Sequence, residues 1–142
     1  MNETEFDEDD MLFWASVVIY VEQEVKPKLN GFFINNKRLK SFLKQNNITL
    51  KWNKFSKLSF PENSDENTII FSIRKNIVAD LLCHLRNAFA HLYIEKNSTG
   101  DYILSDHYRN KSLNMKGRIK QELLKKLFEQ IKATRSIKGP QT

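Results

Sequence analysis

Apolar residues near the start of the chain recur at intervals of three and four positions, a spacing typical of one buried face of a helix. Asp9 or Asp10 suits the amino-terminal cap, because its carboxylate can accept hydrogen bonds from the first free N–H groups. Pro27 and Gly31 then mark the end of this first helix. The face that we expect to be buried consists of Leu12, Phe13, Ser16, Val17, Tyr20 and Val21.

A shorter helix is predicted over residues 35–47, with Asn35 or Asn36 as its cap. Its inward-facing residues would be Leu39, Phe42 and Leu43. The next twenty residues, 48–67, have the composition of a loop, and Pro61 interrupts any regular element there. Apolar residues alternate only over positions 48–52, which allows a short strand.

Residues 68–91 allow two interpretations. A single helix over the whole segment would place Arg74 within the apolar face, where a charge needs a buried partner. We therefore expect an extended segment around Ile69, Phe71 and Ile73, followed by a helix from about Arg74 to His91.

Two β-prone runs flank the turn-forming residues 97–101, which predicts a hairpin. A final helix is expected after Asn114, with Ile119, Leu123, Leu124, Leu127, Phe128 and Ile131 on its buried face. Residues 1–8 and 135–142 are expected to be frayed. The predicted fold is therefore one mainly α domain over residues 1–142, with a small hairpin between the last two helices.

Charge is distributed unevenly along these 142 residues, whose formal net charge is +6. Residues 1–24 carry eight acids and no Lys or Arg, whereas residues 107–142 carry ten bases and two acids. A basic carboxyl-terminal third suits a polyanion such as nucleic acid, although a solvated lysine-rich surface is the alternative. The acidic start lacks the basic segment of an export signal, and the apolar run 11–21 is too short to cross a bilayer, so we expect a cytoplasmic protein. The single cysteine, Cys83, excludes an internal disulfide.

Polar side chains interrupt the predicted helix at residues 84–93, HLRNAFAHLY. At about 100° per residue, His84, Asn87 and His91 share one face of a helix. Arg86 lies about 140° from His91 around the same helix and roughly 7.5 Å from it along the axis. Arg86 and His91 therefore converge on one small group only if the helix ends there, if the arginine swings round, or if a second copy of the chain supplies one of them.

These residue types suit cleavage of RNA without a metal. Histidine can carry the proton of the 2′-hydroxyl or of the leaving oxygen, and arginine can hold the phosphate with paired donors. Two other interpretations remain open at this point. The histidines can be structural, or His84 and His91 can be metal ligands, although only Asp80 stands near them as a carboxylate and no cofactor is expected.

The six residues from Arg86 to His91 resemble the R-N-x-x-x-H motif of HEPN domains. This resemblance implies a helical bundle that forms a homodimer with both motifs at a shared cleft, and a metal-independent endoribonuclease activity. Arg86 would engage the phosphate, His91 would act as general acid or base, and Asn87 would support them, with His84 as a further supporting residue. Toxins of toxin–antitoxin pairs and effectors of abortive phage defence are known in the family.

Tyr93 extends the match to R-x-x-x-x-H-x-Y, the form found in toxins whose antitoxin modifies that tyrosine, so Tyr93 is a possible modification site and an antitoxin protein a possible partner. A related group of HEPN proteins usually has glycine after the histidine, where this chain has Leu92. Two functional hypotheses follow. The chain is either a dimeric ribonuclease or a catalytically silent HEPN module that binds RNA or a partner protein.

Overall fold

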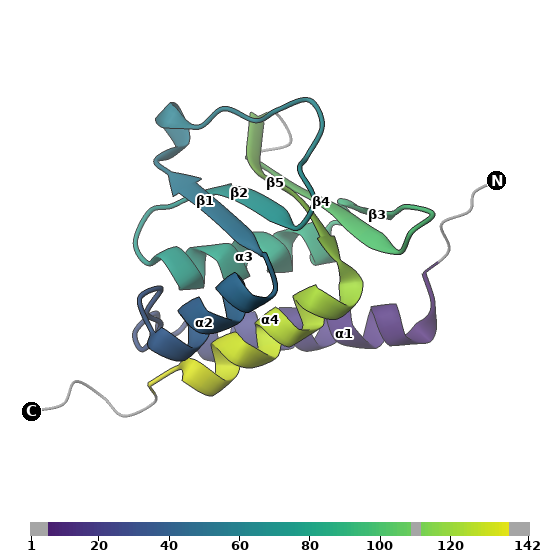
Figure 1. The fold of residues 1–142 in the computed structure, drawn as a ribbon. Coiled ribbons are helices and arrows are strands. Elements are labelled where there is room, and N and C mark those ends of the chain that lie inside the picture. The colour runs from purple at the N-terminus through teal and green to yellow at the C-terminus, as the bar shows by residue number, and fades with distance from the viewer. Residues whose placement is uncertain (1–5, 109–111, 137–142) are drawn as a thin grey trace, which may run out of the picture.

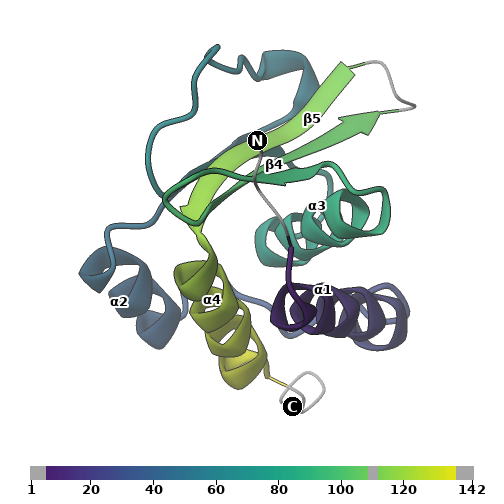
Figure 2. The same ribbon diagram turned by 90° about the vertical axis from the view of Figure 1, so that its right-hand side faces the viewer.

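The computed structural model describes residues 6–108 and 112–136. It is an α+β fold in which a five-stranded mixed sheet forms one layer and the helices lie together on one side of it (Figures 1 and 2). The prediction of a mainly helical bundle is therefore wrong. In chain order the elements are α1 (Glu8–Tyr20), a π-helical turn η1 (Val21–Val25), α2 (Lys37–Gln45), β1 (Thr49–Asn53), a 3-10 turn η2 (Phe55–Lys57), β2 (Thr68–Ser72), α3 (Ile77–Ala90), β3 (Ile94–Lys96), β4 (Asp101–Tyr108), β5 (Ser112–Lys120) and α4 (Gln121–Thr134).

The strands lie in the order β1-β2-β5-β4-β3. Only β1 and β2 are parallel, and the other neighbours are antiparallel. The hairpin predicted around residues 97–101 is confirmed as the β3–β4 connection, and the extended segment predicted around Ile69 and Phe71 is confirmed as β2. The α2 helix is also confirmed, with Asn36 Oδ1 accepting from the Leu39 amide as its cap.

The sheet is larger than predicted because residues 112–120 form β5 instead of the start of the last helix. Asn114 is therefore not a helix cap, and α4 begins at Gln121. Burial alternates along β5, with Met115, Gly117 and Ile119 fully or almost fully covered, which is the period-two pattern of a strand. Gly117 faces β2 so closely that a Cβ there would lie 2.9 Å from Cγ1 of Ile69.

The first helix begins two residues earlier than predicted, because Asp7 is its cap. Asp7 and Asp10 form a reciprocal capping box, in which each carboxylate accepts from the other's amide at 2.9 Å. Leu12 is 63 % exposed and Ser16 is exposed too, so the predicted buried face is wrong at these two positions. Phe6 packs edge-on against Trp14, which fixes part of the segment expected to be frayed; residues 1–5 lie outside the described residues.

At the other end, Arg135 and Ser136 are also anchored, since the Ser136 amide donates to the Gly31 carbonyl and the Arg135 guanidinium lies over the ring of Phe32. The rest of the predicted frayed end, residues 137–142, lies outside the described residues.

The core lies between the helices and one face of the sheet, and α3 is the helix that contacts both the sheet and α1. Among the described residues, the opposite face of the sheet carries no α-helix; the segment 54–67, which includes the short turn η2, passes over it (Figure 1). No helix in the described part of the chain is long and apolar enough to cross a membrane. The predicted site residues all come from α3 and the turn that follows it.

Candidate functional site

Both ends of α3 are fixed by local hydrogen bonds. At its start, Asn76 Oδ1 accepts from the Ala79 amide, and Asp80 accepts from the amides of Arg74 and Lys75, so the helix begins three residues after the predicted Arg74. At its end, the Tyr93 amide donates to the Ala88 carbonyl at 2.8 Å and the Leu92 amide to the Phe89 carbonyl at 3.3 Å. This pair of bonds is a Schellman motif, which places His91 at the carboxyl-terminal cap of the helix.

Leu92 occupies the left-handed position of that motif, with φ at +58°. A non-glycine side chain is strained there by about 1–2 kcal/mol, so glycine is the residue that this position favours. Leu92 is also 69 % exposed, so packing does not compensate for the strain.

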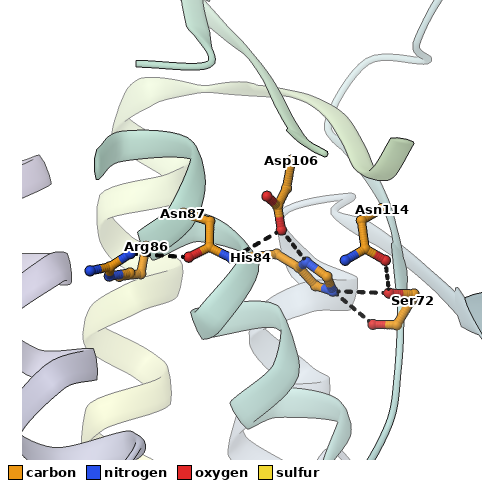
Figure 3. A network of polar contacts seen from close by, with 6 residues as sticks. All are labelled: Ser72, His84, Arg86, Asn87, Asp106 and Asn114. Atoms are coloured by element: carbon orange, nitrogen blue, oxygen red, sulfur yellow. Dashed lines mark hydrogen bonds and ion pairs between the residues drawn. The ribbon is translucent and has the colours of Figure 1, made fainter. Parts of the chain in front are cut away.

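His84 stands at the centre of a buried polar network that joins four elements, α3, β2, β4 and β5 (Figure 3). Its Nδ1 lies 2.8 Å from Oδ2 of Asp106 on β4, and its Nε2 lies 2.8 Å from the carbonyl oxygen of Ser72 on β2. Both partners are hydrogen-bond acceptors, one at each nitrogen of the ring. The Ser72 hydroxyl lies 3.3 Å from Nε2 and donates to Asn114 on β5. His84 therefore attaches α3 to the sheet.

Asp106 also carries the network outward to the predicted site. Asn87 Nδ2 donates to Asp106 Oδ2 at 3.2 Å, and Asn87 Oδ1 accepts from Arg86 Nη1 at 3.2 Å. The buried carboxylate thus orients the amide, and the amide orients the guanidinium (Figure 3). On its other side, Arg86 Nε lies 2.8 Å from Glu22 Oε2 on η1; its N–H is not aimed along that line, so the contact is an ion pair without a hydrogen bond.

Glu22 is shared between two cations. A hydrogen bond from Lys26 is the largest influence on this carboxyl, and together with the charge of Arg86 it holds the pKa of Glu22 below its ordinary value, against the opposing effect of burial. Glu22 therefore stays ionised beside Arg86 at neutral pH.

His91 lies outside this network, exposed at the end of α3. Its ring lies 5.8 Å from that of half-buried Tyr93, centroid to centroid, and the Tyr93 ring lies 4.8 Å from that of His107 on β4. His107 Nδ1 is buried and has no hydrogen-bond partner within the part of the chain that the structure describes. Two histidines thus flank one tyrosine at the β3 edge of the sheet.

The structure therefore brings together only some of the predicted residues. Arg86, Asn87 and His84 join one network, whereas no hydrogen bond or ion pair links Arg86 to His91 among the described residues. Sequence reasoning missed Asp106, because the position of this residue depends on the pairing of β4 with β5. It also left His107 without a partner. For Asp106, a signal was present in the alternation of Tyr102, Leu104 and Asp106 on the buried face of β4.

Two other chemistries find little support in this arrangement. Across residues 6–108 and 112–136, no three side chains among His, Cys, Asp and Glu come together as metal ligands would, and Asp80 is occupied as a cap. Burial raises the pKa of the Cys83 thiol, and the charge of Asp80 raises it further, which disfavours the nucleophilic thiolate.

Comparison of the chain with family models, with curated protein sequences and with solved structures gave no match.

Proposed function

We propose that the protein is a metal-independent endoribonuclease, in which Arg86 binds the scissile phosphate and His91 transfers the proton. The observation that carries this proposal is the chain of contacts from buried Asp106 through Asn87 to Arg86, one turn before an exposed histidine at the helix end. A fixed cation and a titratable imidazole are the two groups that RNA cleavage needs when no metal is used. The proposal rests on these residues and not on a helical bundle.

In the proposed reaction, one imidazole takes the proton of the 2′-hydroxyl, and the 2′-oxygen attacks phosphorus. The bond from phosphorus to the 5′-oxygen breaks, and that oxygen takes a proton from a second acid. The products are a 2′,3′-cyclic phosphate and a free 5′-hydroxyl. Arg86 offsets the charge that develops on the phosphoryl oxygens, and we assign the role of second proton carrier to His107, whose ring contacts that of Tyr93.

A homodimer can bring together Arg86 and His91, which do not meet within one chain. Within one chain Arg86 is directed to Glu22, away from His91. One side of α1 packs against α3. Its outer side exposes apolar side chains that suit an interface with a second copy, namely Met11 (56 %), Leu12 (63 %) and Ile19 (54 %). Pairing two copies would allow Arg86 of one to meet His91 of the other.

A silent module that binds RNA or a partner protein is the second candidate, and the Glu22 contact favours it. An arginine already neutralised by a carboxylate at 2.8 Å is less available to a phosphate.

The first test incubates the full chain with total RNA in EDTA. The variants are His91→Ala and Arg86→Ala, and Arg38→Ala on α2 is the exposed control. We expect cyclic-phosphate ends from the wild type and the control, and a loss of roughly 100-fold or more in His91→Ala, since general acid–base catalysis contributes that much. Equal cutting by His91→Ala contradicts the proposal. Absence of cutting by the dimeric wild type, with RNA still bound, supports the silent module.

A mixing experiment tests the composite site. His91→Ala and Arg86→Ala are each inactive alone, but in a mixed dimer one of the two sites keeps both residues if these come from different copies. An equal mixture should then recover about a quarter of the wild-type activity. No recovery from a mixture that has exchanged subunits places both residues of a site in the same chain.

A further inference from the structure

The helix-free face of the sheet carries a row of side chains that leads toward His91. Side chains alternate along each strand, so Ile69, Phe71 and Leu104 face the core, while their neighbours point to the other side. The cross-strand register places in one row, from β1 to β4, the residues Lys51, Ile70, Lys116 and Ser105. Ser105 in turn donates its amide to the carbonyl of Tyr93, the residue in contact with His91.

A hollow of about 520 Å³ lies at the β1 end of this row, a volume within the range of ligand-binding pockets. Its floor is the sheet and its wall is the segment 54–67. Lys116 Nζ fastens that wall by donating to the carbonyl oxygens of Pro61 and Glu62, at 2.7 and 2.6 Å. The hollow is therefore held open by a bonded loop.

The lining of this hollow combines cations with an apolar wall. The basic residues in the lining are Lys51, Lys57 and Lys116, and the acidic residue is Asp65. Lys51 and Lys57 are exposed, and neither makes an ion pair within the described residues. Phe60 and Ile70 provide apolar surface beside them.

We propose that this hollow, here called the three-lysine hollow, binds single-stranded RNA, with phosphates on Lys51 and Lys57 and a base against Phe60. Lysines are point charges suited to phosphate, and aromatic faces stack bases without regard to sequence. The inference rests on the proposed ribonuclease function and gives it a substrate class. At about 4.8 Å between strands, Lys51 lies roughly 19 Å from Tyr93, so one extended RNA strand crosses the helix-free face to the edge where Tyr93 contacts His91.

The test measures RNA binding without cleavage. Full-length protein carrying His91→Ala binds a fluorescein-labelled single-stranded RNA in EDTA, and anisotropy is recorded from 50 to 200 mM salt. Lys51→Ala with Lys57→Ala is compared with Lys37→Ala and Lys40→Ala, two exposed lysines on α2 that give the same change of charge. Circular dichroism and thermal melting confirm that each variant is folded.

We expect the hollow variant to bind about tenfold more weakly at low salt, with a salt slope lower by about 1.4, since each phosphate contact on single strands contributes about 0.7. The α2 variant should lose threefold or less. Phe60→Ala should weaken binding about fivefold without changing the slope, because stacking on one base is worth at least that much. Equal affinities for the hollow and α2 variants overturn the inference.

The binding experiment tests the three-lysine hollow separately from the nuclease proposal. Wild-type protein that cuts no RNA, but whose binding still depends on the two lysines, leaves the three-lysine hollow as an RNA site and removes only the catalysis. Normal cutting with no dependence on the lysines removes only the hollow.

Discussion

Replacing Asp106 with asparagine tests whether the buried network is what holds the site in place. The side chain keeps its size and one acceptor oxygen, but it loses the negative charge that faces both His84 Nδ1, at 2.8 Å, and Asn87 Nδ2, at 3.2 Å. The carboxylate and the imidazole are both almost fully covered, with side-chain exposures of 4 % and 9 %. Water therefore cannot replace what the substitution removes.

The magnitude follows from these contacts. Removing one partner of a buried ion pair costs about 3–5 kcal/mol, because the other charge is left uncompensated. Asparagine still accepts one hydrogen bond, so we expect a smaller loss of about 2–3 kcal/mol, near the upper end of the range for hydrogen bonds to charged groups. For a chain of this size, that corresponds to a melting temperature lower by roughly 5–10 °C.

Urea unfolding at pH 7 measures the free energy of unfolding, with Asp65→Asn on the exposed 54–67 segment as the matched control, expected to change it by less than about 0.5 kcal/mol. The same substitution in a His84→Ala background should cost much less, since the interaction is already gone. A loss no greater than that of the control, or an equal loss in both backgrounds, refutes the assignment of Asp106 as the carboxylate that holds His84.

Three further predictions concern the frame around the site. Asp10→Asn should cost about 2–3 kcal/mol at pH 7, because Asp10 accepts from Tyr102 and Lys96. Burial alone would raise the pKa of Asp10, but these bonds outweigh it and hold the pKa below 3.8. The stabilisation is therefore present above that pH and is lost as the pH falls through the lowered pKa. Urea unfolding from pH 7 to pH 3 should show the difference in free energy of unfolding between Asp10→Asn and wild type becoming smaller. Gly117→Ala should destabilise by about 1–3 kcal/mol, seen as a lower melting temperature, and an unchanged melt contradicts the close packing of β5 on β2. Leu92→Gly should relieve the left-handed strain and raise stability by about 0.5 kcal/mol after glycine's entropy is subtracted, whereas a clear loss in the same melt shows that the leucine is not strained.

Local signals in the sequence predicted the elements that depend on near neighbours. Asn36 caps α2 as expected, the turn at 97–101 forms a hairpin, and residues 68–72 are extended and separate from α3 as expected. The end of α3 at His91 was also predicted, since the motif and the β-prone residues after it point to the same boundary.

The sheet was missed because its long-range pairing leaves little local trace. Residues 112–120 contain Lys, Gly and Arg between apolar positions, and the good helix formers after Gln121 made the whole segment resemble one helix. The segment forms a strand and not a helix because the backbone of β5 pairs with β2 on one side and with β4 on the other. Asp106 belongs to the same difficulty, since its contact with His84 exists only once β4 is placed beside α3.

The central position of β5 has a consequence for synthesis of the protein. This strand lies between β2 and β4 in the sheet but follows both of them in the chain. A nascent polypeptide that ends before residue 112 therefore cannot join the strand pair β1–β2 to the strand pair β3–β4. Pairing of β2 with β5 joins residues 68–71 to residues 115–118, which are far apart in the sequence, so closure of the sheet is a late and slow step. For the ribonuclease proposed above, this order would leave the sheet beneath the Asp106–Asn87–Arg86 contacts unfinished until the last strand is made.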